Sequence, residues 1–201
     1  MKKIILICLI WGIGLMAPAT VCADDTAARK QLERSINAIL DILKDDHLRQ
    51  ETNTVLRREA LREKIYERFD LERMSLFSLG RHWRGITPKQ RQTFVALFSQ
   101  LLEKSYVEKI ESYTDEQVMY VKELVRGDKA QIDTIIVTDS IEIPIDYRMY
   151  QTDDGEWMVY DLVVEGVSLV ANYRSQFTQM LDSGTFESLI IELEKKIESN
   201  S

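Results

Sequence analysis

The chain has 201 residues, with 26 Lys and Arg against 33 Asp and Glu, and a formal net charge of −7 at pH 7. This acidic balance argues against nucleic-acid binding and against permanent residence on an anionic membrane, because both require an excess of positive charge. Both cysteines, Cys8 and Cys22, lie near the start of the chain, so the rest of it has no disulfide or thiol chemistry.

The first residues have the pattern of a secretory signal peptide. Two lysines precede an apolar run from Ile4 to Met16, and Val21-Cys22-Ala23 provides a small-residue exit. We expect residues 1–23 to be cleaved after Ala23, which leaves a mature chain of 178 residues. The apolar run is short for a membrane span, which disfavours an uncleaved anchor, and Val21 is bulky for a lipoprotein site at Cys22.

Residues 24–113 have the apolar spacing of helices. A first helix is predicted from Asp24 or Asp25 to about His47, and a second from Thr54. The segment Thr87-Pro88-Lys89-Gln90 predicts the start of a long helix that ends near Tyr113, because it combines a cap, a first-turn proline and a capping box. We interpret the basic face of the second helix as solvated, with a docking patch as the alternative; its members are Arg57, Arg58, Arg62 and Lys64.

The pattern changes to strands over residues 116–166. Short connections join the apolar or alternating segments, which predicts an antiparallel meander of four strands. These strands are predicted at about Gln117–Val125, Ala130–Thr138, Ile141–Met149 and Trp157–Val164. The last strand is apolar on both faces, so we expect it to be covered on two sides.

Residues 167–199 return to helical spacing, in predicted helices at Val167–Leu181 and Thr185–Ser199. Helices thus come first, strands follow and helices end the chain. This order predicts a single α+β domain over residues 24–201, with helices packed on one face of a curved, twisted sheet.

The sequence offers few catalytic candidates. His47 and His82 are far apart and have no metal-ligand spacing, and the chain has no glycine-rich phosphate loop or nucleophile elbow. We therefore expect no metal site, no cofactor and no enzymatic activity. A serine hydrolase with His82 or His47 as its base stays open, although neither histidine has a recognisable setting.

Asp161 and Glu165 lie in or just after an apolar strand. A carboxylate buried in an apolar cone can have a raised pKa and act as a general base, as an isomerase or dehydratase would require. The alternative is structural: Asp161 pairs with an Arg or Tyr across the sheet, and Glu165 caps the next helix.

The segment Trp157–Phe177 carries a family resemblance. Its W-x-V-Y-D, V-E-G-V-S-L and N-Y-R-x-Q-F motifs resemble the toluene-tolerance family of periplasmic phospholipid-binding proteins. Further matches are Phe69-Asp70, Leu79-Gly80-Arg81, Thr87-Pro88-x-Gln90 and Ser105-Tyr106, in the same order along most of the chain. One departure is His82, where a less distinctive residue is usual.

The resemblance implies a cystatin-like or cone-type fold, in which a twisted sheet and helices enclose a deep apolar cavity for acyl chains. It implies a periplasmic carrier that moves phospholipid, as cargo, between an outer-membrane lipoprotein complex and an inner-membrane ABC transporter with a lipid-binding hexamer. Such Mla-type traffic maintains outer-membrane lipid asymmetry. We expect a monomer that docks only transiently. A hopanoid-linked carrier of the same family and an interaction protein with a solid core remain alternatives.

Large apolar positions on the family-matched elements are the predicted lining of the cavity: Met74, Leu79, Trp83, Phe98, Leu101, Tyr106, Ile143, Ile145, Tyr147, Val163, Val167, Val170 and Tyr173. Three arginines, Arg81, Arg84 and Arg174, are predicted to contact the head-group phosphate at the mouth, because Arg binds phosphate with two parallel hydrogen bonds. A structural ion pair is the alternative for each of them.

Overall fold

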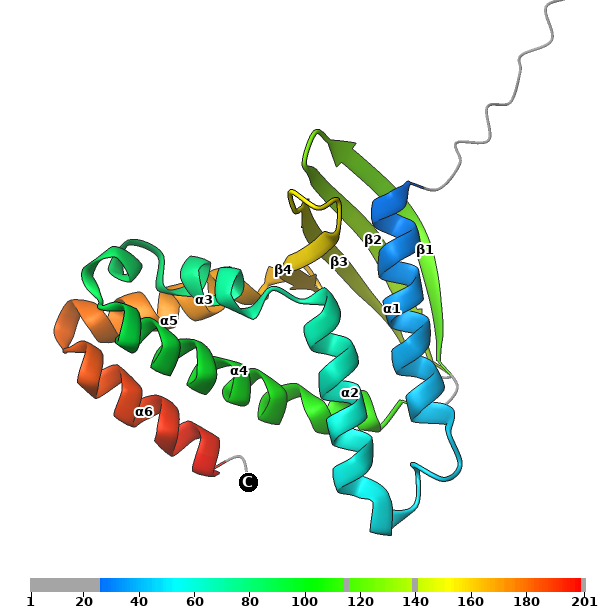
Figure 1. The fold of residues 1–201 in the computed structure, drawn as a ribbon, viewed down its shortest axis with the longest axis horizontal. Coiled ribbons are helices and arrows are strands. Elements are labelled where there is room, and N and C mark those ends of the chain that lie inside the picture. The colour runs from blue at the N-terminus through cyan, green and yellow to red at the C-terminus, as the bar shows by residue number, and fades with distance from the viewer. Residues whose placement is uncertain (1–25, 114–115, 139–140, 200–201) are drawn as a thin grey trace, which may run out of the picture.

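The computed structural model describes residues 26–113, 116–138 and 141–199 (Figure 1). The predicted signal peptide, residues 1–23, lies outside the described residues. Over the described ranges, none of the helices combines the length and the hydrophobicity that a membrane span requires.

Four helices precede the sheet and two follow it: α1 (Ala27–Lys44), α2 (Thr54–Arg68), α3 (Leu71–Leu79), α4 (Pro88–Glu111), α5 (Leu169–Ser183) and α6 (Phe186–Ser199). Two 3-10 turns, η1 (Glu51–Asn53) and η2 (Gly80–Gly85), precede α2 and α4. The predicted start of α4 is confirmed, because the Gln90 amide donates to Thr87 Oγ1 at 3.3 Å and the Thr87 amide donates to Gln90 Oε1 at 2.9 Å.

The sheet is an antiparallel meander, as predicted, in the order β1-β2-β3-β4-β5. Its strands are β1 (Gln117–Arg126), β2 (Lys129–Val137), β3 (Glu142–Gln151), β4 (Trp157–Val164) and β5 (Val167–Ser168). The predicted count of four strands was wrong. Glu165 (φ 50°) and Gly166 (φ 80°) form a tight left-handed turn that returns Val167 against Val164. The next helix therefore begins at Leu169 and not at Val167.

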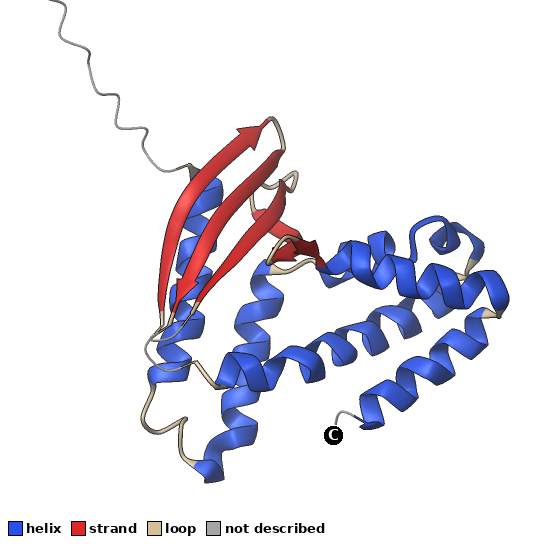
Figure 2. Cartoon of the chain, turned by 180° about the vertical axis from the view of Figure 1, so that it is seen from behind, coloured by secondary structure: helices blue, strands red, loops and turns tan. Residues whose placement is uncertain are grey.

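Most of the buried apolar residues form two cores. The sheet core lies between α1 and one face of the sheet, which we call the inner face, and contains Ala28, Leu32, Ile36, Ala130, Ile132, Tyr147, Met149, Trp157 and Val159. The helical core lies within the layer of α3, η2, α4, α5 and α6. Figure 2 shows this layer extending away from the sheet, so only part of the helical set covers the sheet face.

The two cores meet at few positions. Among the described residues, only Phe69 and Leu162 pack at the edge of both. The amide of Asp70 donates to the carbonyl of Val159 at 2.9 Å, and Phe69 forms a parallel bridge with Val159. The helical layer is thus attached to the sheet along β4.

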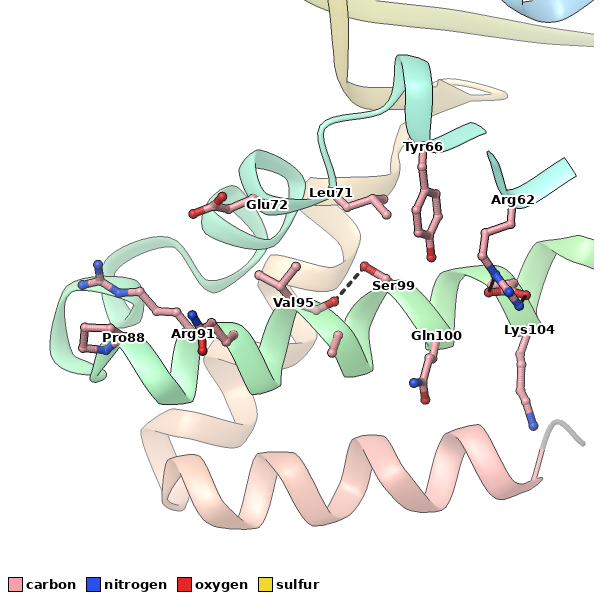
Figure 3. Close-up of a pocket in the computed structure, with 13 residues that line it drawn as sticks. Arg62, Tyr66, Leu71, Glu72, Pro88, Arg91, Val95, Ser99, Gln100 and Lys104 are labelled. Carbon is pink, nitrogen blue, oxygen red and sulfur yellow. Dashed lines mark hydrogen bonds and ion pairs between the residues drawn. The ribbon is translucent and has the colours of Figure 1, made fainter. Parts of the chain in front are cut away.

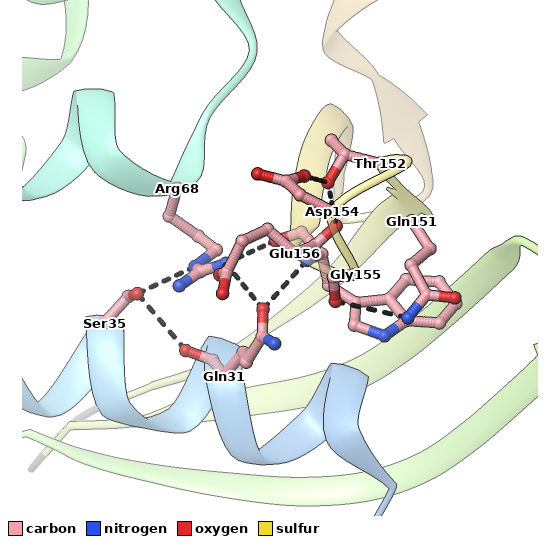
Figure 4. Close-up of polar contacts among 9 residues, drawn as sticks. Gln31, Ser35, Arg68, Gln151, Thr152, Asp154, Gly155 and Glu156 are labelled. Carbon is pink, nitrogen blue, oxygen red and sulfur yellow. Dashed lines mark hydrogen bonds and ion pairs between the residues drawn. The ribbon is translucent and has the colours of Figure 1, made fainter.

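Polar contacts join α1, the end of α2 and the β3–β4 hairpin (Figure 4). Gln31 Oε1 accepts hydrogen bonds from Arg68 Nη1 at 2.9 Å and from the Trp157 amide at 2.8 Å. Arg68 Nε also donates to Ser35 Oγ at 2.9 Å. These contacts fix the C-terminal end of α2 to the sheet lobe, by which we mean α1 and β1–β4.

Candidate functional site

Asp161 is a structural residue in this fold. Its side chain is buried, and Oδ2 accepts hydrogen bonds from Arg148 Nη1 at 2.9 Å and Ser168 Oγ at 2.7 Å. Oδ1 accepts from the Val170 amide at 3.0 Å, in the first turn of α5. Three donors bind this carboxylate, which therefore holds the start of α5 on the sheet. The predicted pairing with an arginine across the sheet is confirmed.

Glu165 does not cap the next helix. Ser168 does so, because its Oγ accepts a hydrogen bond from the Ala171 amide at 3.0 Å. Glu165 occupies the first position of the β4–β5 turn. The geometry of the two acids therefore provides an anchor and a turn, with no open carboxylate facing a cleft.

Most of the predicted lining residues belong to the helical core: Met74, Leu79, Trp83, Phe98, Leu101, Val170 and Tyr173, with Tyr106 at its edge. Aromatic rings fill this region. Phe98 contacts Tyr173 edge-on with centroids 5.0 Å apart, and Phe94 contacts Phe177 in the same way at 5.4 Å. These side chains pack against one another, as in an ordinary protein interior.

The predicted lining residues on the sheet divide between its two faces. Tyr147 pairs with Leu162 and faces the sheet core, whereas Val163 pairs with Asp146 on the opposite face. A bulge between Arg148 and Met149 shifts the register of β4 within the strand. Sequence alternation cannot reveal such a shift, so the face that Val163 occupies could not be predicted from the sequence.

Two of the sheet positions, Ile143 and Ile145, share the inner face with Tyr147 and are only half-buried. Val167 has 59% of its surface exposed in β5. It therefore lines no enclosed cavity in this structure, contrary to the prediction.

The three predicted mouth arginines gather around η2. Arg81 forms an ion pair with Asp182, Arg84 is exposed in the same turn, and the Arg174 side chain lies against Gly80. Gly80 has φ 54°, and a Cβ there would lie 3.2 Å from Arg174 Cδ, so glycine suits both the turn and the close approach. The structural alternative is therefore confirmed for Arg81.

A hollow of about 1050 Å³ lies between α2, α3 and α4 (Figure 3). None of the predicted site residues lines it. Its lining is mixed in character: Arg62, Tyr66, Leu71, Glu72, Pro88, Arg91, Gln92, Val95, Ala96, Ser99, Gln100, Glu103 and Lys104. The signal in the sequence was the pair of small residues, Ala96 and Ser99, in the middle of a helix with large neighbours. We call this hollow the groove.

One face of α4 continues from the groove toward the sheet. Residues three or four positions apart share a helix face, and Gln92, Val95, Ser99 and Glu103 are followed at that spacing by Tyr106 and Ile110. Tyr106 and Ile110 are half-buried.

Tyr113, just beyond α4, brings this face to the sheet. It lies close enough to Tyr147 to add to the rise in pKa that burial gives the Tyr147 phenol. The end of α4 therefore lies near the inner face of the sheet. We define the junction as the region that includes Tyr106, Ile110 and Tyr113, at and just after the end of α4, and Ile145 and Tyr147 on the inner face of β3; of these, Tyr113 and Tyr147 lie close together.

Ion pairs join α2 to α4 beside the junction. Glu111, whose side chain is 9% exposed, pairs with Arg57 at 3.0 Å and Arg58 at 2.9 Å. Glu103 Oε2 accepts from Arg62 Nε at 2.9 Å. Arg58 and Arg62 remain 41% and 44% exposed, in agreement with a solvated face, but each of the three arginines also reaches a specific carboxylate on α4.

Side chains that could bind a metal ion are dispersed over the part of the chain that the structure covers. Within it, no group of three or more His, Cys, Asp or Glu side chains is arranged to hold a metal ion. His82 Nε2 lies 3.6 Å from Asp182 and 3.2 Å from Arg81 Nε, in the exposed η2 region.

Comparison with known proteins gives consistent relatives. The model of the MlaC protein family matches residues 33–195. The intermembrane phospholipid transport system binding protein MlaC of Haemophilus influenzae is 24% identical over 143 residues, which cover 69% of this chain and 67% of that protein. The phospholipid-binding protein of Ralstonia solanacearum, solved in complex with a phospholipid, aligns with a TM-score of 0.78 and 23% identity, over 86% of this chain and 98% of that one. This last likeness establishes a shared fold.

Proposed function

The chain belongs to the MlaC protein family, and we propose that it is a non-enzymatic periplasmic carrier of phospholipid. The family match over residues 33–195 supports this proposal, as do the names of its relatives, which are a phospholipid transport binding protein and a phospholipid-binding protein. The signal-peptide pattern at residues 1–23 is consistent with export.

A carrier solves a problem of free energy. Exposing an acyl chain to water costs about 0.8 kcal/mol for each CH2 group, so a phospholipid crosses an aqueous compartment unaided only at a very low rate. A protein that surrounds the chains replaces one hydrocarbon environment with another. Transfer then needs apolar surface that can open and close, and it needs no catalytic residue.

We place the acyl chains at the junction. The observation that carries this assignment is the division of the apolar interior into two cores that share only Phe69 and Leu162 at their edges. Large apolar side chains at the junction, such as Tyr106, Ile110 and Ile145, are half-buried, whereas those of the helical core are closely packed. An apolar ligand gains most where apolar surface still faces water.

The predicted mouth arginines lie away from this place. They surround η2, which precedes α4, whereas the junction lies at the end of α4. A helix of 24 residues is roughly 36 Å long. We therefore propose that head groups are held nearer the groove, whose rim carries Arg62 and Arg91.

The wider cycle follows the family resemblance. We propose that the carrier, as a monomer, receives lipid from one membrane complex and delivers it to another. The partners would be an outer-membrane lipoprotein complex and an inner-membrane ABC transporter with a lipid-binding hexamer, and the result would be the maintenance of outer-membrane lipid asymmetry.

Native mass spectrometry of the mature protein, after incubation with vesicles of phosphatidylethanolamine and phosphatidylglycerol, tests the proposal. We expect a mass excess that matches phospholipid in the wild type and its loss in Ile145→Glu, which places a charge at the junction. Val167→Glu is the matched control and should keep the lipid, because Val167 is exposed.

Three other outcomes would count against the proposal. A wild type that stays free of lipid contradicts the carrier function, and a mass excess that matches a hopanoid would identify a different cargo. Equal loss of lipid from both variants contradicts the location at the junction.

A further inference from the structure

Helix α2 is attached to the helical layer by charge and hardly by apolar packing. Leu61 is the one residue of α2 that is buried, and Val55 and Leu56 at its start are 70% and 49% exposed. Among the described residues, neither of the two cores includes a member of α2. Its contacts with α4 include the ion pairs that Arg57 and Arg58 make with Glu111, and Arg62 with Glu103.

The two ends of α2 are held differently. At the C-terminal end, Arg68 donates to Ser35 and Gln31 of α1 and to the carbonyl of Trp157 in β4 (Figure 4). That end therefore belongs to the sheet lobe. The N-terminal half reaches α4 through side-chain ion pairs, and the solvent-exposed pair of Arg62 with Glu103 breaks at less cost than a packed apolar contact. A swing of the N-terminal half of α2 about Arg68 would break these ion pairs, whereas Arg68 would keep its hydrogen bonds to α1 and β4.

The position of α2 gives such a movement a consequence. Arg62 lies at one end of the groove, as Figure 3 shows, and pairs with Glu103, which also lines the groove. On the same face of α4, Tyr106 and Ile110 of the junction follow Glu103 directly. The ion pairs of α2 with Glu103 and Glu111 lie on either side of Tyr106 and Ile110, so the helix crosses α4 over the junction, next to the end of the groove.

We propose that α2 is a gate for the lipid, fastened to α4 by Glu103 and Glu111, and that acyl chains pass along the face of α4 from the groove to the junction when the fastening opens. This inference rests on the proposed function and deepens it by naming a route and a control point. Glu111 is the main fastening because it is nearly buried and accepts hydrogen bonds from two arginines. Glu103 is the weaker one because its partner Arg62 is 44% exposed.

The test measures the rate at which a phospholipid with a fluorescent acyl chain leaves the loaded protein for vesicles of phosphatidylethanolamine and phosphatidylglycerol. Glu111→Gln should raise this rate about tenfold, and Glu103→Gln about threefold, because charge-assisted hydrogen bonds are lost. Ala96→Trp, at an exposed position on the groove, should slow the transfer without weakening the fold.

A matched control is Glu67→Gln, which removes the Lys64–Glu67 pair within α2 and touches no residue of α4. Its release rate should equal that of the wild type. The double charge swap Arg62→Glu with Glu103→Arg should restore the rate that either single reversal raises. Unchanged release in Glu111→Gln, or faster release in the control, would overturn the gate.

Hydrogen–deuterium exchange separates the gate from the carrier function. Glu111→Gln should increase the exchange of amides at 54–62 and leave those of the helical core unchanged, whether or not lipid is bound. Equal exchange in the variant and the wild type contradicts the gate even if the protein carries lipid. Faster exchange in a protein that binds no lipid supports a hinged α2 and contradicts the carrier.

Discussion

The helical core and the junction use similar side chains in different ways. In the helical core, Phe94, Phe98, Tyr173 and Phe177 contact one another edge-on or stacked, and each is nearly or fully buried. At the junction, Tyr106 and Ile110 remain half-buried although they continue the same helix. The helical core is closely packed, whereas the junction retains apolar surface that is exposed to solvent.

The difference lies in how the surrounding elements are fastened. Along β4, Asp161 holds α5 by hydrogen bonds from the Val170 amide and Arg148, and the Asp70 amide, just before α3, donates to the Val159 carbonyl. On the other side of the helical layer, ion pairs attach α2 to α4. A protein that must open for a ligand without unfolding benefits from one firm side and one that yields.

The largest effect that would sharpen this comparison is expected in the helical core. Phe98→Ala should lower the free energy of unfolding by about 4 kcal/mol, because it removes a fully buried ring from an aromatic cluster. Ile110→Ala, at the junction, should cost only about 1 kcal/mol, because Ile110 already faces water in part. Urea denaturation measures both. Equal losses would mean that the junction is packed like the core.

The next effect concerns the attachment of α5 to β4 by Asp161. Asp161→Asn should cost about 3 kcal/mol, since the change leaves Arg148 without a carboxylate partner and weakens the cap of α5. Asp133→Asn, on the half-exposed face of β2, serves as the control and should change stability by less than about 0.5 kcal/mol. An unchanged free energy of unfolding in Asp161→Asn would contradict the structural role of this residue.

A smaller effect concerns alkaline pH. Burial, with a further contribution from the hydrogen bond to Asp70, raises the pKa of Tyr150 from its ordinary value of 10 to about 12. The phenol therefore ionises first in the unfolded chain, so its contribution to stability is complete below pH 10 and is lost as the pH rises toward 12.

We expect the wild type to lose about 2 kcal/mol more than Tyr150→Phe over that interval. Denaturation curves of the two proteins at several pH values between about 9 and 12 measure this difference, because that range spans the pKa of the phenol in the unfolded and the folded chain. Parallel pH profiles would show that the contact between Tyr150 and Asp70 does not contribute in this way.

Sequence reasoning succeeded where a local rule decides the structure. The capping box at Thr87 and the short strand connections give α4 and the meander correctly. It could not show which face Val163 occupies or that Val167 is exposed, because a bulge and a two-residue turn with a non-glycine residue at φ 50° decide these positions. Such irregularities arise from tertiary packing and leave little trace in the pattern of apolar residues.

The candidate site was harder to predict for a related reason. Residues that fill a core and residues that line a cavity have the same composition, so Phe98 and Tyr106 looked alike in the sequence. The ion pairs of α2 were hidden because their partners are 41 to 54 positions away. Only the fold shows that Arg57, Arg58 and Arg62 meet Glu111 and Glu103.

The most direct test of the account is to locate the bound lipid. The loaded protein would carry a phosphatidylglycerol with a photoreactive group at the end of one acyl chain, and the cross-linked peptides would be mapped after irradiation. The account predicts adducts at the end of α4 and on the inner face of β3, near Tyr106 and Ile145. Adducts confined to η2 and the start of α5, or no adducts at all, would contradict it.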